Sequence, residues 1–140
     1  MDIPVGPNRP TVDSDSEKWW QAIQDRRVLI NACAACGRNS LYMRSFCPHC
    51  WSTDVRPTQA SGRATLYTWS VVHQNAAPFD ARTPYVVAMV DLAEGPRLMT
   101  IIEDCPVESL TREMELVIAF RDDDGFIVPV FRPATDMGKE

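Results

Sequence analysis

The sequence predicts a mainly β protein with a short N-terminal helix, a cysteine-rich ribbon and a small closed barrel of five strands. Three observations support this fold class. Two Cys-x-x-Cys pairs lie ten residues apart, and a short segment with two adjacent tryptophans precedes them. Five segments rich in β-forming residues follow within about 70 residues. A chain of 140 residues has room for one or two small units of this kind.

An N-terminal arm and helix are expected over residues 1–26. Residues 1–13 carry three prolines without periodicity, so they predict an extended arm. Ser14 or Ser16 can cap a helix that has Glu17 in its first turn. The apolar face of this helix consists of Trp19, Trp20 and Ile23. So short a helix does not persist alone, and its face is expected to pack either on the protein's own core or on another subunit.

The four cysteines of the two pairs predict a metal site. They are Cys33, Cys36, Cys47 and Cys50. A two-residue gap lets two thiolates reach one metal from a tight turn, and the ten intervening residues suffice for a hairpin that brings both pairs together. Gly37 follows the first pair, where such a turn needs a positive φ, and Pro48 stiffens the second turn. The spacing therefore predicts a structural Zn²⁺ site in a ribbon over residues 27–60. A closed four-thiolate site offers no position for water or substrate.

Two other interpretations of the cysteines are weaker. A redox Cys-x-x-Cys motif occurs as one copy at the start of a helix in a βαβ unit, and this sequence predicts no such unit. Disulfides are disfavoured because no signal peptide is visible, which indicates a cytoplasmic location where thiols stay reduced. Cys105 stands alone before Pro106. It is interpreted as a half-buried thiol at a strand end rather than a nucleophile.

Within the ribbon, residues 27–32 predict a strand that leads into the first cysteine pair. Residues 41–46 are expected to cross back to the second pair, and residues 52–59 to form a connector. Such a ribbon depends on its metal more than on a large core.

The barrel is expected over residues 61–133, followed by a disordered tail over residues 134–140. The predicted strands are residues 64–73, 85–92, 97–104, 113–121 and 126–132. The turn at 93–96 makes the second and third strands an antiparallel hairpin. Five short strands that close on themselves in so few residues are typical of an OB-fold barrel.

The connections between these strands have their own signals. Residues 74–83 predict a loop with an exposed Phe79, and residues 106–112 a short irregular or helical turn. The run Asp122-Asp123-Asp124-Gly125 predicts a solvated hairpin turn, because it lacks the spaced ligands and terminal Glu of a calcium loop. Pro129 indicates an edge or a bulge in the last strand.

Composition argues against several classes of function. The formal net charge is −5 and there is no basic run, which disfavours general nucleic-acid binding. No apolar run approaches the roughly 18 residues of a membrane span. The two histidines are His49, inside a cysteine pair, and His73, at a strand end. No nucleophile–base pair can be proposed from them, so no catalytic residue is predicted.

Taken together, these features resemble a family of zinc-ribbon, OB-fold proteins long known as a domain of unknown function. The resemblance covers residues 17–132 and combines the Trp-containing helix and the ribbon with three further stretches. These are Ser61-Gly62-Arg63, Leu66-Tyr67-Thr68-Trp69-Ser70-Val71-Val72 and Pro84-Tyr85-Val86-Val87-Ala88. Many members have Pro-Pro-Arg or Pro-Arg where this chain has Tyr42-Met43-Arg44, and a glycine where it has Arg112-Glu113.

The resemblance implies a non-catalytic accessory subunit that binds and completes a thiolase-fold enzyme acting on acyl-CoA thioesters. Such a partner is a lipid-transfer-protein-like steroid side-chain retro-aldolase or a thiolase/acyltransferase. The resemblance further implies a hetero-oligomer with the acyl-CoA substrate at the partner's site. In the aldolase systems the domain is similar to the C-terminal part of a longer hydratase subunit. The chain is therefore expected to be either a free-standing subunit or an excised domain.

Two alternatives belong to other classes. Zinc ribbons and OB barrels also bind single-stranded nucleic acid, and Tyr67, Trp69 and Phe120 are candidate stacking platforms, but the negative charge opposes this function. Direct binding of acyl-CoA is the second alternative. Its candidate phosphate ligands are Arg63, Arg82 and Arg97, although nothing in their spacing singles them out. If His73 or the 74–83 loop has a functional role, the hypothesis is that it shapes the partner's substrate channel.

Overall fold

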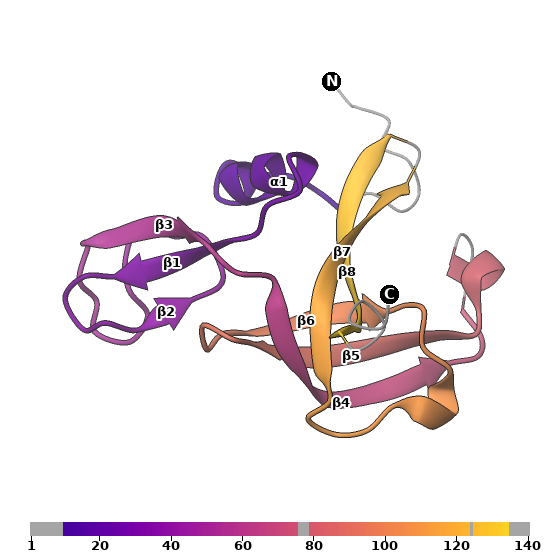
Figure 1. The fold of residues 1–140 in the computed structure, drawn as a ribbon. Helices are drawn as coiled ribbons and strands as arrows, with labels where there is room; N and C mark the ends of the chain where they lie inside the picture. The colour runs from indigo at the N-terminus through magenta and orange to yellow at the C-terminus, as the bar shows by residue number, and fades with distance from the viewer. Residues whose placement is uncertain (1–9, 76–78, 124, 135–140) are drawn as a thin grey trace.

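The computed structural model in Figure 1 describes residues 10–75, 79–123 and 125–134. Its described part contains one α-helix, a three-stranded sheet and a closed barrel of five strands. This confirms the mainly β fold. No helix in these stretches is long and apolar enough to cross a membrane. Most of the predicted arm, the predicted tail beyond Ala134, and residues 76–78 of the predicted loop lie outside the described residues.

Helix α1 (Glu17–Gln24) packs on the protein's own core. Ile23 is fully buried, and the indole Nε1 of Trp19 donates a hydrogen bond of 3.1 Å to the carbonyl oxygen of Leu29. The ring of Trp20 lies 5.4 Å from that of Phe126 in the barrel. The tryptophan face thus packs on the protein's own core, with both indoles partly buried, and the alternative of docking on another subunit stays a prediction. Ser16 is the N-cap residue, and it exchanges hydrogen bonds with Asp13 rather than capping the helix with its side chain.

The side chain of Gln24, at the end of this helix, takes the place of a strand partner for Ile127 in the last barrel strand. Its Nε2 donates to the carbonyl oxygen of Ile127 at 3.0 Å, and its Oε1 accepts from the Ile127 N–H at 2.9 Å. An amide group has the same donor and acceptor pair as a peptide unit, so it can complete an open strand edge.

The ribbon sheet has β1 (Leu29–Cys33) at its centre, paired antiparallel with β2 (Asn39–Ser40) and β3 (Val55–Gln59). The expected connector at 52–59 is wrong in its second half, which forms β3. Sequence reasoning missed this strand because it is a mostly exposed edge strand with Pro57 at its centre, and it lacks apolar alternation.

The buried Asn31 of β1 fixes the chain between the two cysteine pairs. It is 2% exposed, and its Nδ2 donates to the carbonyl oxygens of Tyr42 and Arg44, each at 3.3 Å. A polar group this deep is tolerated because it is hydrogen-bonded. As a result, the irregular segment 41–44 is held against the sheet although it forms no backbone hydrogen-bond ladder with a neighbouring strand.

The barrel strands run in the spatial order β4-β5-β6-β8-β7, and β7 closes on β4. Their bounds are β4 (Arg63–Val72), β5 (Tyr85–Leu92), β6 (Arg97–Ile102), β7 (Glu115–Asp123) and β8 (Phe126–Pro133). All five predicted strands are confirmed, with ends that shift by one or two residues. Strand β7 begins after Glu113, whose φ of 69° interrupts extended backbone. The connections contain two short 3₁₀ helices, η1 (Phe79–Arg82) and η2 (Val107–Ser109).

The barrel is weakly joined at one place. Strands β6 and β8 run parallel and pair only through Ile102 and Phe131. Pro129 lies on the part of β8 that pairs with β7 but not with β6, so its missing N–H breaks no ladder. The strand edge predicted at Pro129 is therefore observed: it is the side of β8 that faces β6, which stays unpaired there among the described residues although the barrel closes at Ile102 and Phe131.

One continuous core links the helix, the ribbon and the barrel. Its members include Ile23 from α1, Ile30 from the ribbon, and Leu66 and Phe131 from the barrel, all at most 1% exposed. At the junction, Gly62 has a φ of +88°, and a Cβ there would lie 2.6 Å from Cγ2 of Ile118. This close approach of backbone to side chain explains a glycine at the entry to the barrel.

We predict that Gln24→Ala loses about 1–3 kcal/mol of unfolding free energy, because the N–H and carbonyl of Ile127 lose their partners. Gln21→Ala is the matched control on the same helix, since its exposed side-chain amide hydrogen-bonds to the exposed Glu17. We expect this control to change stability by less than about 0.5 kcal/mol. Urea titration of both variants measures the difference, and equal stabilities would contradict the role of Gln24.

Candidate functional site

The structure brings the four predicted cysteine ligands together. Their Sγ atoms all lie within 4.8 Å of one another, and Cys33–Cys50 and Cys36–Cys47 are each separated by 3.7 Å. Four sulfurs about 2.3 Å from one Zn²⁺ in a regular tetrahedron would be about 3.8 Å apart. The Cys33–Cys50 and Cys36–Cys47 pairs match this spacing, and the whole group, within 4.8 Å, is close to what a tetrahedral thiolate site requires.

Two turns of the same design present these thiols. In the first, the Gly37 N–H donates to the carbonyl oxygen of Cys33 at 2.9 Å, and Gly37 has a φ of 80°. In the second, the Trp51 N–H donates to the carbonyl oxygen of Cys47 at 2.8 Å, and Trp51 has a φ of 68°. The prediction for Gly37 is consistent with this geometry. Sequence reasoning did not single out Trp51, because tryptophan is rare in this backbone region.

The unusual backbone of Trp51 projects its side chain from the ribbon. The indole is 73% exposed and stacks on Phe46 with ring centroids 5.2 Å apart. The guanidinium group of Arg44 lies 5.7 Å from the Phe46 ring on the same segment. These contacts support the second cysteine turn from outside.

The close thiols differ in acidity. Burial opposes ionisation of Cys47, but N–H groups of Cys50 and His49 and neighbouring thiols lower its pKa to about 7. For Cys50, the Ser52 N–H favours the thiolate, but burial and the three other thiols raise its pKa to about 12. This divergence is expected when four ionisable sulfurs share one small volume.

The side chains of the two histidines and of the fifth cysteine are not part of the four-thiol group, although the backbone N–H of His49 donates to Sγ of Cys47 at 3.4 Å. The Nδ1 of His49 is 3.3 Å from a guanidinium nitrogen of Arg38, and His73 is exposed after β4. Cys105 is half-buried and packs against the core after β6. Within the described residues, the four cysteines form the one group of three or more His, Cys, Asp or Glu side chains close enough to hold a metal.

The three arginines considered as ligands for CoA phosphates have different surroundings. Arg97 pairs with Asp91 at 2.6 Å and covers the ring of Tyr67 at 3.6 Å. Arg82 pairs with Asp123, and Arg63 is exposed on β4. The structure does not gather these groups into one phosphate site.

The rings proposed as stacking platforms are also largely occupied. Trp69 and Phe120 are partly buried against the core, and Tyr67 lies under Arg97. These contacts compete with stacked bases for the ring faces, although Tyr67 remains 38% exposed.

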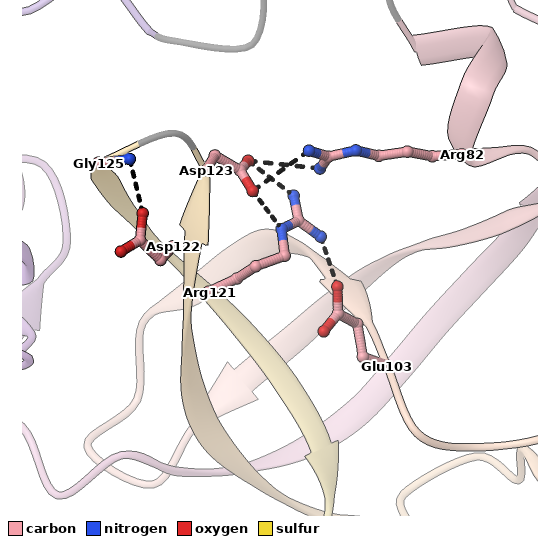
Figure 2. A network of polar contacts seen from close by, with 6 residues as sticks. All are labelled: Arg82, Glu103, Arg121, Asp122, Asp123 and Gly125. Atoms are coloured by element: carbon pink, nitrogen blue, oxygen red, sulfur yellow. Dashed lines mark hydrogen bonds and ion pairs between the residues drawn. The ribbon is translucent and has the colours of Figure 1, made fainter.

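Figure 2 shows an ionic network that joins η1 to the barrel. The carboxylate of Asp123 accepts from Nε of Arg121 at 2.9 Å and pairs with Nη2 of Arg82 at 3.2 Å. A second nitrogen of Arg121 donates to Glu103. The side chain of Asp123 is 8% exposed, so the predicted solvated turn is wrong at this position. Strand β7 extends through Asp123 and places it against Arg82, a residue 41 positions away that no local pattern identifies.

A groove of about 1420 Å³ lies between the start of α1, the ribbon segment 41–43 and the β6–β8 side of the barrel. The apolar side chains that line it include Trp19, Trp20, Tyr42, Met99, Val107 and Val130. All four members of the ionic network also line it. The groove was not predicted, because its walls come from segments that are distant in sequence.

Comparisons with known proteins agree with this architecture. The family model of the ChsH2 rubredoxin-like zinc ribbon domain matches residues 20–56, and that of the ChsH2 C-terminal OB-fold domain matches residues 57–121. Among solved structures, the chain is similar to "Ltp2-ChsH2(DUF35) aldolase", with a TM-score of 0.80 and 35% identity. This match covers 90% of the chain and 99% of the solved one.

Three curated relatives add to this picture. A "DUF35 domain-containing scaffold protein" of Methanocaldococcus jannaschii is 36% identical, over 77% of this chain and 82% of the relative. A "Probable enoyl-CoA hydratase alpha subunit" of Thermomonospora curvata is 35% identical over 90% of this chain, which spans only 40% of that relative's length. "Benzoylsuccinyl-CoA thiolase subunit BbsA" of Thauera aromatica is 31% identical, over 53% of this chain and 50% of the relative.

We predict that Asp123→Asn destabilises the fold by about 1–3 kcal/mol at pH 7, because both arginines lose a charged acceptor. Burial raises the pKa of Asp123, but the hydrogen bonds from Arg121 and Arg82 hold it below the ordinary value of 3.8. The stabilisation is therefore complete above that value and is lost as the pH falls through the lower, folded-state pKa.

Urea unfolding of wild type and variant at pH 7 and in acid tests this prediction. The difference in stability should shrink below pH 3.8. Asp122→Asn removes a charge from the same hairpin, but it keeps an oxygen for the Gly125 N–H, so it serves as the control. A stability difference that persists unchanged in acid would contradict the ionic role of Asp123.

Proposed function

Because the chain belongs to the DUF35 family, in its ChsH2-type form with a zinc ribbon and an OB-fold domain, we propose that it is an accessory subunit of a thiolase-fold enzyme acting on acyl-CoA thioesters. The observation that carries this proposal is the similarity over nearly the whole ChsH2(DUF35) chain of a solved aldolase. The names of the Thermomonospora and Thauera relatives support a CoA-thioester substrate.

In this proposal the partner subunit performs the chemistry. It is a steroid side-chain retro-aldolase of the lipid-transfer-protein-like type or a thiolase/acyltransferase, and it holds the acyl-CoA. The present chain binds the partner as part of a hetero-oligomer and completes its site. The cytoplasm suits this assembly, because the four thiols stay reduced there.

We also propose that Cys33, Cys36, Cys47 and Cys50 hold one structural Zn²⁺. The sulfur spacing and the match to a rubredoxin-like zinc ribbon support this assignment. Bound there, Zn²⁺ would cross-link the two cysteine turns and supply no reaction chemistry, since all four positions are filled by thiolates. The ion would thereby fix the 41–44 segment that Asn31 holds from the other side.

The zinc proposal predicts one Zn²⁺ per purified chain and its loss in Cys36→Ser, which leaves three thiolate ligands. Because structural zinc contributes about 10–16 kcal/mol in small zinc-finger peptides, we expect the ribbon to unfold in this variant. Cys105→Ser is the control and should keep its metal. Elemental analysis with circular dichroism provides the measurement. A fully folded wild-type chain without metal would refute the assignment.

The accessory role predicts a stable complex with a thiolase-fold partner protein from the same organism. After co-expression, the two proteins should co-elute from a size-exclusion column, and only the complex should turn over its CoA thioester. The isolated chain should show no turnover. Separate elution of the two proteins, or thioester turnover by the isolated chain, would refute the proposed function.

A further inference from the structure

The groove between α1, the ribbon and the barrel has the surface of an interaction site. Three large apolar side chains remain exposed along it: Tyr42 at 66%, Met99 at 65% and Val107 at 45%. Single exposed apolar residues are ordinary, but several that line one groove indicate a partner. Tyr42 comes from the ribbon and the other two from the barrel side, so the site depends on both parts.

The charges of the groove identify the kind of partner. Its lining includes five carboxylates and two guanidinium groups, a net charge of −3. Both guanidinium groups, those of Arg82 and Arg121, already pair with carboxylates of the network. The remaining acidic groups include the exposed Asp15 at the start of α1. This balance disfavours anionic occupants such as CoA phosphates or nucleic acid and favours a segment with basic side chains.

The backbone at the groove favours an extended occupant. Strand β6 pairs with β5 along its whole length, but it meets β8 only at Ile102. Within the described residues, the β8-facing edge of β6 over residues 97–101 therefore has no strand partner. Thr100 lies on this stretch and lines the groove; it is 8% exposed, and its hydroxyl has no hydrogen-bond partner in the described part of the chain. The open strand edge suits a strand added from another chain, whereas the buried Thr100 hydroxyl lies on the inward-facing side of β6 with Leu98 and Ile102.

We propose that this groove receives an extended segment of the partner subunit, with apolar side chains toward Tyr42 and Met99 and Lys or Arg toward Asp15. The segment pairs its backbone with the open edge of β6. This inference rests on the proposed function, because the partner is the thiolase-fold subunit of the complex described above.

The test measures the affinity of the co-expressed thiolase-fold subunit for four variants of this chain. Met99→Glu places a charge on the apolar floor and should weaken binding at least 100-fold, whereas Tyr67→Glu alters an exposed ring outside the groove and should not. Asp15→Lys should weaken binding about tenfold, more at low salt. Glu115→Lys makes the same charge change on the exposed start of β7 and should leave binding unchanged.

Hydrogen–deuterium exchange of the complex provides the backbone readout. The amides of residues 97–101 that point away from β5 should exchange at least tenfold more slowly in the complex than in the isolated chain. If the complex forms but all four variants bind like wild type, or exchange in β6 is unchanged, the groove inference is overturned and the accessory role remains. Protection of β6 by coenzyme A alone would also overturn it. Failure of the wild-type proteins to associate would overturn both proposals.

Discussion

The convergence of four thiols is the constraint on which the ribbon depends. Two turns, one closed by Gly37 and the other by Trp51, bring the sulfurs within 4.8 Å of one another. Between these turns the chain has almost no regular structure, since β2 is two residues long. The path of segment 41–44 is set by the thiols on one side and by Asn31 on the other. One wall of the groove therefore depends on the geometry of the cysteine turns.

The barrel contributes a rigid frame with one incomplete seam. Its strands are fixed by alternating burial, as in β5, where every second side chain is buried. At the seam between β6 and β8, α1 covers part of the opening and the ionic network of Arg82, Arg121 and Asp123 ties η1 to the adjacent hairpin. The helix, the ribbon and the barrel thus meet around one groove. This arrangement suits a subunit that acts through contact with a larger enzyme.

The sequence was most informative where local patterns decide the structure. The cysteine spacing and the five barrel strands are local features, and they were predicted close to their observed positions. Strand β3 was missed because Pro57 and its exposed neighbours show no strand pattern, although β1 supplies the pairing. The burial of Asp123 was missed because its partner Arg82 is remote in sequence. The groove has no local signature, since residues from several elements form it only after folding.

The amide of Gln24 has a consequence for the behaviour of the molecule in solution. By occupying the N–H and carbonyl of Ile127, it blocks a position where a strand of another molecule would otherwise add. Exposed sheet edges are a common origin of aggregation. Helix α1 therefore prevents the edge of β8 at Ile127 from pairing with a strand of another molecule. A shortened chain that begins after residue 26 would lack this protection and would be prone to polymerise through β8.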